Sequence, residues 1–366
     1  MNIVIIDCFD TWEHRVDLLY KVLKSEGHSI TCLLSDFRHI EKIRRNDSKQ
    51  DTILFTAEPY LKNISPARLH SHMQLSADIF SWVENRKATI DLLWILAPPN
   101  SFVKDAARIK RAHPRIKLII DLIDLWPETM PVGKMKLALF PWKRLRNEYL
   151  NTADAVVTEC DMYQEKLEGV VDKNKMTTLY LARVNKGYKP DLHLSDDKIS
   201  LCYLGSINNI IDIESIVEII REFGRRKTVI LHIIGHGEKK GELIEAVENV
   251  GAEVVDHGKI YDRELKQAIF DACHYGLNIM KDGVCVGLTM KSIDYFEFGL
   301  PIINNIKGDT WDVIEKECCG LNWGGNNTQF NIIPSMQMRE SARNFFERCL
   351  TEDVFRSKIN KIVAFT

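Results

Sequence analysis

Along the chain, short apolar runs alternate with segments whose apolar residues recur every three or four positions. The short runs are typical of buried strands, and the wider spacing is typical of helices with one buried face. In the first half, the predicted strands are 2–7, 29–34, 51–56, 91–96, 116–121 and 154–159. The helical segment 13–27 ends at Gly27, a suitable C-cap. Because the strands are continuously apolar, the pattern predicts a parallel sheet covered on both faces.

The same alternation returns in the second half after a polar stretch. Residues 185–197 contain Gly and Pro and lack periodic apolar positions, which indicates an interdomain linker. The predicted strands that follow are 198–205, 227–235, 252–258, 275–280 and 300–305, with helices at 212–226 and 262–273. Asp262 is expected to cap the second of these helices, and 335–363 reads as one or two terminal helices.

These elements predict an α/β protein made of two doubly wound Rossmann-like domains facing an interdomain cleft. A chain of 366 residues exceeds the size at which one core usually stops growing. We expect a first domain at 1–184, the linker 185–197, a second domain at 198–336 and C-terminal helices at 337–366 that can pack back on the first domain.

Composition narrows the class of protein. The 49 basic and 51 acidic residues give a net charge of −2, which argues against a dedicated nucleic-acid binder. The nine cysteines show no disulfide framework or zinc spacing and fit a reducing compartment. With no signal sequence and no apolar run long enough to span a bilayer, we expect a cytoplasmic protein, at most peripheral on the inner face of the membrane.

The segment 289–303 presents a cation and an anion on one helical face. Met290, Ile293 and Phe296 share one side of the predicted helix, whereas Lys291 and Asp294 lie on the other. Such an i, i+3 pair alone is more often a surface ion pair than a binding site. Its position beside a strand end nevertheless makes a diphosphate contact for Lys291 and a hydroxyl contact for Asp294 possible.

Two further motifs follow strands of the second domain. After the strand 198–205, Gly205, Ser206 and Asn208 form either a phosphate-binding turn or a plain turn between strand and helix. After the strand 227–235, the run 235–238 (Gly-His-Gly-Glu) has only part of a dinucleotide fingerprint, so a structural turn is favoured for it locally. Together with Lys291, the three motifs indicate one binding site.

These motifs carry a family resemblance. The run "KSIDYFEFGLPII" (291–303) resembles the K-x-x-E-Y-x-x-x-G-x-P-V-I element of retaining GT-B glycosyltransferases of family 4. "IDLIDLWPET" (120–129) resembles their D-x-x-D-L-W-P-E segment, which is common in bacterial capsule, O-antigen and exopolysaccharide enzymes. "NTADAVVTEC" (151–160) resembles the strand that follows, and the resemblance covers nearly the whole chain in order and spacing.

The resemblance implies a set of donor contacts. Lys291 would contact the donor diphosphate, and Asp294 would bind ribose hydroxyls in place of the family's second glutamate. The remaining donor-binding candidates are Gly205, Ser206, Asn208, Gly235, His236, Gly237, Glu238, Tyr261 and Thr289. The catalytic candidates are Lys291, Asn100 and Asp124. The resemblance implies no cofactor and no required metal, and Asp121 and Asp124 are better explained as strand-end caps than as metal ligands.

Three positions depart from the family pattern. Val286 stands where the family has its first acidic residue, and the loop 7–15 contains no glycine. Asn100 replaces a histidine, and an amide can bond a sugar hydroxyl but cannot act as an acid or base.

Two segments of the first domain are candidates for the acceptor or membrane side. The run 133–149 interleaves basic and aromatic residues, which suits either an anionic membrane surface or a helix packed on the sheet. The run 57–76 is rich in polar and aromatic groups, and His70 and His72 diverge on a helix, so at least one is a bystander. The candidates are Tyr60, Arg68, Lys136, Trp142, Lys143 and Arg144.

The sequence therefore predicts a retaining hexosyltransferase. It would move a sugar from a UDP- or GDP-linked donor to a lipid-linked glycan in bacterial surface polysaccharide synthesis. The alternatives are a non-catalytic GT-B-like subunit that stabilises an active transferase, and a nucleotide-sugar epimerase. Val286 and Asn100 favour the first alternative, and the second would need an acid/base set that the sequence does not supply.

Overall fold

The computed structural model describes residues 1–366 except 47–48, 131–138, 192–193, 196 and 325–332. The chain divides into two compact units. The first unit contains Met1–Leu181 together with Phe355–Thr366, and the second contains Ala182–Val354. The division falls three residues before the predicted end of the first domain, and the last residues of the chain group with the first unit.

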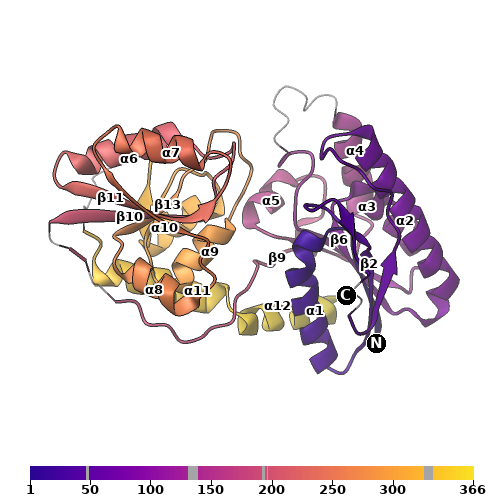
Figure 1. The fold of residues 1–366 in the computed structure, drawn as a ribbon. Coiled ribbons are helices and arrows are strands. Elements are labelled where there is room, and N and C mark those ends of the chain that lie inside the picture. The colour runs from indigo at the N-terminus through magenta and orange to yellow at the C-terminus, as the bar shows by residue number, and fades with distance from the viewer. Residues whose placement is uncertain (47–48, 131–138, 192–193, 196, 325–332) are drawn as a thin grey trace. The chain divides into compact units, whose positions relative to one another are not determined.

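The first unit is built on a parallel sheet with the strand order β5-β2-β1-β6-β7-β8-β9 (Figure 1). Its strands are β1 (Asn2–Asp7), β2 (Ser29–Ser35), β5 (Thr52–Phe55), β6 (Leu92–Ala97), β7 (Lys117–Leu122), β8 (Ala155–Thr158) and β9 (Met176–Thr178). A two-stranded antiparallel hairpin, β3 (Phe37–Arg38) and β4 (Ile43–Arg44), follows β2. The central strand β6 is buried along its whole length, which agrees with helices covering both faces of the sheet.

Helices cover this sheet. They are α1 (Glu13–Ser25), α2 (Pro66–Arg86), α3 (Asn100–Ala112), α4 (Phe140–Leu150), α5 (Asp161–Lys166) and the C-terminal α12 (Glu352–Phe365). Figure 1 shows α12 beside α1, and Arg15 of α1 lies 5.7 Å from the ring of Phe355. The guanidinium of Arg15 also forms a buried two-pronged ion pair with Asp121 of β7 at 2.7 and 2.9 Å. Asp121 is thus committed to holding α1 on the sheet.

The second unit has its own parallel sheet, with the strand order β12-β11-β10-β13-β14-β15 (Figure 1). Its strands are β10 (Lys198–Ser206), β11 (Thr228–His236), β12 (Glu253–Gly258), β13 (Tyr275–Asn278), β14 (Ile302–Asn304) and β15 (Gly320–Asn322). Its helices are α6 (Ile213–Gly224), α7 (Lys240–Glu248), α8 (Arg263–Asp271), α9 (Met290–Glu297), α10 (Asp309–Glu317) and α11 (Met336–Cys349). Apolar side chains of β10, β11 and β13 form one core with α6 and α7.

The predicted α/β class and two parallel sheets are confirmed, and the predicted strands match to within two residues at each end. The predicted cap is also present, since the side chain of Asp262 accepts a hydrogen bond from the Leu265 amide at 2.8 Å. The pattern missed β9 and β15, which are three-residue edge strands too short to give a periodic signal. The terminal segment 335–363 forms two helices, α11 and α12.

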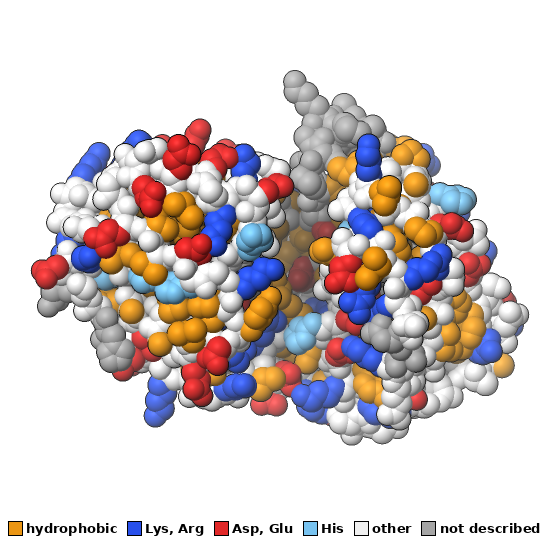
Figure 2. All heavy atoms as spheres, in the orientation of Figure 1, with side chains coloured by type: hydrophobic (Ala, Val, Ile, Leu, Met, Phe, Trp, Pro, Cys, Tyr) orange, Lys and Arg blue, Asp and Glu red, His pale blue; other side chains and the backbone are white. Residues whose placement is uncertain are grey.

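Both signs of charge are interspersed over the face of the molecule in Figure 2, as the net charge of −2 leads one to expect. Within the described residues, no helix combines the length and the apolar character needed to cross a bilayer.

Candidate functional site

The strand orders identify where each sheet is suited to bind a ligand. In the first sheet the chain order reverses between the neighbours β1 and β6, and in the second it reverses between β10 and β13. Ligands of open parallel sheets bind beyond the carboxyl ends of the strands at such a switch point. The candidate residues at these strand ends are therefore the ones best placed to bind a ligand.

In the second unit, Lys291 lies at this position with the loop that follows β10. Its ammonium group lies 4.4 Å from the centre of the Tyr203 ring and 3.3 Å from the Tyr203 hydroxyl. That hydroxyl donates in turn to the Ser206 carbonyl at 3.0 Å. The structure thus brings Lys291 together with the predicted turn of Gly205, Ser206 and Asn208, in which the side chain of Ser206 is exposed.

The charge on Lys291 is uncompensated. Among the described residues it forms no ion pair with an acidic side chain; its partner is the Tyr203 hydroxyl. Burial lowers the pKa of Lys291 from 10.5 to about 7, because the ammonium group loses water and gains no counter-charge. A nearby anion would reverse this shift. The arrangement is suited to a ligand that brings negative charge of its own.

A ladder of buried amides fixes the helix that carries Lys291. Thr289 caps α9 by accepting a hydrogen bond from the Ser292 amide at 3.1 Å. The Thr289 hydroxyl also donates to Asn278 at 3.0 Å, and the Asn278 amide donates to Asn304 at 2.8 Å. Asn278 and Asn304 are the last residues of β13 and β14. Thr289, a candidate for binding the sugar donor, therefore connects the N-terminus of α9 to the ends of β13 and β14.

The glycines after β11 have a packing reason. A Cβ on Gly235 would lie 2.0 Å from the Gly205 carbonyl oxygen, and one on Gly237 would lie 2.1 Å from the Ile207 carbonyl oxygen. The loops after β10 and β11 are also bonded to each other, with the Lys239 amide donating to Ile207 at 3.0 Å. This supports the structural interpretation of these glycines and places the second loop against the first.

The exposed residues of these loops complete the set of candidates. His236 is exposed, and so is Glu238, which accepts a hydrogen bond from Asn209 at 2.5 Å. Tyr261 is 84% exposed and lies beyond the end of β12. Among these donor candidates, the side chains of His236, Glu238 and Tyr261 are therefore open to solvent in the structure.

Asp294 does not pair with Lys291. Its carboxylate lies 3.3 Å from Nε of Arg183 and 3.6 Å from Nζ of Lys266. The interpretation of Lys291 and Asp294 as a surface ion pair is therefore wrong. Because Asp294 pairs with Arg183 and Lys266 instead, it does not neutralise Lys291. The sequence pattern showed no sign of Arg183 and Lys266 as partners of Asp294. Arg183 and Asp294 are 111 positions apart, and no local pattern connects residues at that separation.

In the first unit, the predicted catalytic residues Asn100 and Asp124 lie near Trp126. The amide of Asn100, the first residue of α3, donates to the carbonyls of Trp126 at 3.3 Å and Trp142 at 2.9 Å. Asp124 accepts a hydrogen bond from the Trp126 indole at 2.7 Å. Burial raises the pKa of Asp124, although Thr129, Trp126 and other neighbours oppose that rise. Both side chains thus hold the loops that follow β6 and β7.

The acceptor candidates Tyr60 and Arg68 meet in a cluster of rings. We call the side chains of Phe9, Tyr60, Arg68, His72 and Trp126 the aromatic cluster; all five are buried. The Arg68 guanidinium lies 4.2 Å from the Trp126 ring centre, 5.3 Å from that of Phe9 and 5.7 Å from that of Tyr60. His72 packs into the same cluster, stacked on Trp126 at 6.0 Å.

The predicted basic and aromatic surface around α4 is partly neutralised. Lys143 pairs with Glu128 at 2.9 Å, and Arg144 lies 3.6 Å from Glu148. Trp142 is half-buried, and Lys136 lies outside the described residues. Arg146 of the same helix is buried and also pairs with Glu128, at 2.9 Å, so these three cations have acidic partners, as expected for a helix packed on its own domain.

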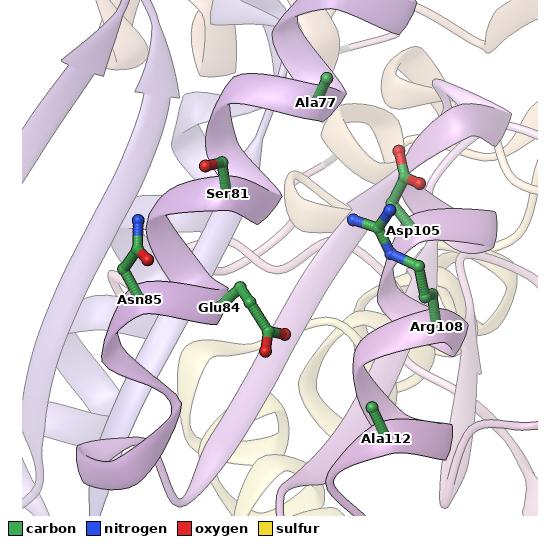
Figure 3. Close-up of a pocket in the computed structure, with 7 residues that line it drawn as sticks. All are labelled: Ala77, Ser81, Glu84, Asn85, Asp105, Arg108 and Ala112. Carbon is green, nitrogen blue, oxygen red and sulfur yellow. The ribbon is translucent and has the colours of Figure 1, made fainter.

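Two shallow pockets lie away from these residues. One, of about 490 Å³, is a groove between α2 and α3 whose lining residues are drawn in Figure 3. Its Glu84 is already bonded to Lys87 and His113. The other, of about 510 Å³, lies beside α5 and is rich in acidic residues. Neither contains a predicted site residue, and in the described part of the chain no three His, Cys, Asp or Glu side chains converge as a metal site.

Comparison of the whole chain with solved structures identifies the architecture. The chain matches the structure of sucrose-phosphate synthase from Thermosynechococcus elongatus at 12% identity with a TM-score of 0.70, and the match covers 100% of this chain and 98% of that chain. It matches the lipopolysaccharide outer core galactosyltransferase WaaB at 14% identity with a TM-score of 0.68, covering 100% and 99%. The fold is GT-B. A third match, Anabaena HepE in complex with UDP, has 13% identity and a TM-score of 0.67 and covers 100% of both chains.

At these identities the likeness establishes the GT-B fold alone. No protein-family model and no curated protein matches the sequence. The placement of Lys291 and the turn after β10 at the switch point of the second GT-B domain therefore comes from the geometry of this chain.

Proposed function

We propose that this protein is a glycosyltransferase that uses a nucleotide-sugar donor. The observation that carries the proposal is the uncompensated, half-buried charge of Lys291, which lies next to the turn after β10 at a ligand-binding switch point. A donor diphosphate supplies the negative charge that this position lacks. The GT-B neighbours support the proposal, since HepE was solved with UDP and with UDP-glucose.

In the proposed reaction, Lys291 stabilises the departing diphosphate. The bond between the anomeric carbon and the diphosphate oxygen breaks, and the new bond forms to an acceptor hydroxyl whose proton passes to the departing phosphate. Electrostatic stabilisation of the leaving group by a fixed cation and by backbone N–H groups of the turn performs this step without a bound metal. Retention of configuration, through transfer on one face of the sugar, is part of the proposal.

The remaining features of the proposal concern the second substrate and the place of action. We propose a hexose as the transferred sugar and a lipid-linked glycan as the acceptor, in the synthesis of bacterial surface polysaccharide as in family 4. The protein would work in the cytoplasm, peripherally at the membrane. The exposed Phe140 at the start of α4, 60% exposed, supports a peripheral contact.

Calorimetric titration with UDP and GDP tests the donor site, and a panel of UDP- and GDP-sugars tests for slow donor hydrolysis. We expect one nucleotide to bind, and Lys291→Met to weaken binding at least tenfold at pH 7, because one charge-assisted contact to phosphate is lost. Lys307→Met is the matched control, since Lys307 lies over the Trp311 ring as Lys291 lies over Tyr203. No binding of either nucleotide would exclude the proposal.

A second candidate rests on Val286. This half-buried residue stands where the family 4 pattern that the sequence resembles has an acid, so the protein could instead be a non-catalytic GT-B subunit that binds an active transferase. Nucleotide binding without hydrolysis or transfer for any donor, together with co-purification of an active transferase, would favour this candidate.

A further inference from the structure

The aromatic cluster of the first unit encloses the cation Arg68, which forms no ion pair with a carboxylate among the described residues; Asp124 acts on it only as a nearby charge. Nε of Arg68 is buried and has no hydrogen-bond acceptor, and NH1 donates to the Asn63 carbonyl at 2.6 Å. A guanidinium carries five N–H donors, and a buried charge is normally paired. The guanidinium of Arg68 therefore has N–H donors that no acceptor in the described structure uses.

The surroundings of Arg68 add unused polar groups and little negative charge. Both ring nitrogens of His72 are buried without a partner, and burial lowers the pKa of this imidazole well below its usual value, so the ring is neutral. Lys42 lies 4.6 Å from the Tyr60 ring centre and adds a second cation. The acidic neighbour Asp124 is bonded to the Trp126 indole rather than to Arg68.

The cluster lies where the first sheet is suited to bind a ligand. Phe9 follows β1, Tyr60 follows β5 and Trp126 follows β7, so all three rings come from carboxyl ends of strands. The Asn63 carbonyl, which accepts from Arg68, belongs to a short loop whose residues 61–64 are exposed. A planar, forked guanidinium is suited to a carboxylate or a phosphate carried by a sugar.

We propose that the acceptor carries a negatively charged group, a carboxylate or a phosphate, that is bound by Arg68 within the aromatic cluster. The anion accepts hydrogen bonds from the Nε edge of the guanidinium, and His72 bonds a neighbouring oxygen of the same sugar. Arg68 thereby selects acidic over neutral acceptors. This inference rests on the proposed function, because it assigns the second substrate of the same enzyme.

Three glycosides distinguish the sources of the charge. Methyl glucuronide carries a carboxylate, methyl glucoside 6-phosphate carries a phosphate, and methyl glucoside is the neutral reference. Binding is measured by saturation-transfer NMR on the full chain with UDP at saturation, which keeps the phosphate probe away from Lys291. We expect one or both acidic probes to bind at least tenfold more tightly than the neutral one. Equal binding of all three, or binding of none, would overturn the inference.

Variants of α2 assign the preference to Arg68. Arg68→Met keeps the length and packing of the side chain and should abolish the preference, leaving the neutral probe within twofold. Arg86→Met is the matched control, because Arg86 lies on the same helix and stacks on Trp82 at 4.3 Å but is exposed. It should change nothing. A preference that survives Arg68→Met unchanged would refute the assignment.

Two further measurements keep the test decisive. If Arg68→Met does not fold, Arg68→Lys retains the charge but loses the fork, and it should reduce the preference severalfold; an undiminished preference would refute the role of the guanidinium. UDP affinity is measured on every variant and should stay within twofold of the wild type. Normal nucleotide binding without any acidic preference defeats this inference alone, whereas absent binding of both UDP and GDP defeats the proposed function.

Discussion

Replacing Lys291 by methionine should remove a pH dependence that the structure predicts for donor binding. In the free protein the pKa of Lys291 is about 7, lowered by burial. A diphosphate favours the charged ammonium, so binding above pH 7 must take up a proton. For a pKa of 7 in the free protein and a much higher one in the complex, the Kd for UDP-glucose should rise about 25-fold from pH 6.5 to 8.5, or about 1.9 kcal/mol.

Calorimetry in two buffers of different ionisation enthalpy measures this proton uptake directly. Phosphate groups of an intact nucleotide-sugar do not titrate in this range, so the proton must go to the protein. Lys291→Met should bind more weakly at pH 6.5, with an affinity that hardly changes up to pH 8.5. GDP-mannose replaces UDP-glucose if the protein selects guanosine. A wild-type affinity that stays constant over this range, with no proton uptake, would refute the reasoning.

The same charge should cost stability, which supplies a folding control. The pKa of Lys291 is lower in the folded than in the unfolded state, so the unfolded state binds more protons between pH 7 and 10.5. The penalty is fully present below pH 7 and disappears as the pH rises towards 10.5. Lys291→Met should therefore raise the free energy of unfolding at pH 7 by about 1–3 kcal/mol, after allowing for the partial exposure of the side chain. In a urea titration its unfolding midpoint should lie at a higher urea concentration than that of the wild type. A destabilised variant would contradict this account.

Three other predictions concern the packing of a glycine loop, a buried ion pair and the need for a metal. Gly237→Ala should destabilise the protein by about 2 kcal/mol or more, because the added Cβ would clash with the Ile207 carbonyl. The control Gly241→Ala, whose Cβ would have no neighbour within 4 Å, should be neutral or slightly stabilising in urea unfolding. Equal effects of the two substitutions would contradict the close approach at Gly237. Arg15→Met should cost about 3–5 kcal/mol, because it leaves the buried Asp121 without its ion-pair partner and with only the Trp94 indole donating to it. Thermal unfolding measures this, and a change below about 1 kcal/mol would count against it. Chelation with EDTA should leave nucleotide affinity unchanged, and a large loss would reveal a metal requirement.

Parts of the candidate site could be predicted because they depend on strand ends. The turn of Gly205, Ser206 and Asn208 and the helix of Lys291 each follow a strand of one parallel sheet, and parallel strands bring their carboxyl ends to one edge. In the structure Tyr203 links Lys291 to this turn, because its hydroxyl accepts from Lys291 and donates to the Ser206 carbonyl. Tyr203 itself was missed, since a tyrosine inside an apolar strand looks like a core residue.

Other parts could not be predicted from local pattern. Asp294 lies three residues from Lys291 in sequence but bonds Arg183 and Lys266, because its partners are chosen by the packing of distant segments. The sequence left open which of His70 and His72 is a bystander; the structure places His72 inside the aromatic cluster and leaves His70 exposed. Such choices depend on what lies across from a side chain, which spacing does not reveal.

The helices, the strands and the class of fold follow from local patterns in the amino-acid sequence. Apolar periodicity and capping residues act over a few positions, so they define the strands, the helices and the start of α8 at Asp262. Which charges remain without an ion pair depends on how distant segments pack. Lys291 and Arg68 resemble many other basic residues in the sequence, and their unpaired state appears only when all their neighbours are in place, because an ion pair acts over a few ångströms in space regardless of separation along the chain.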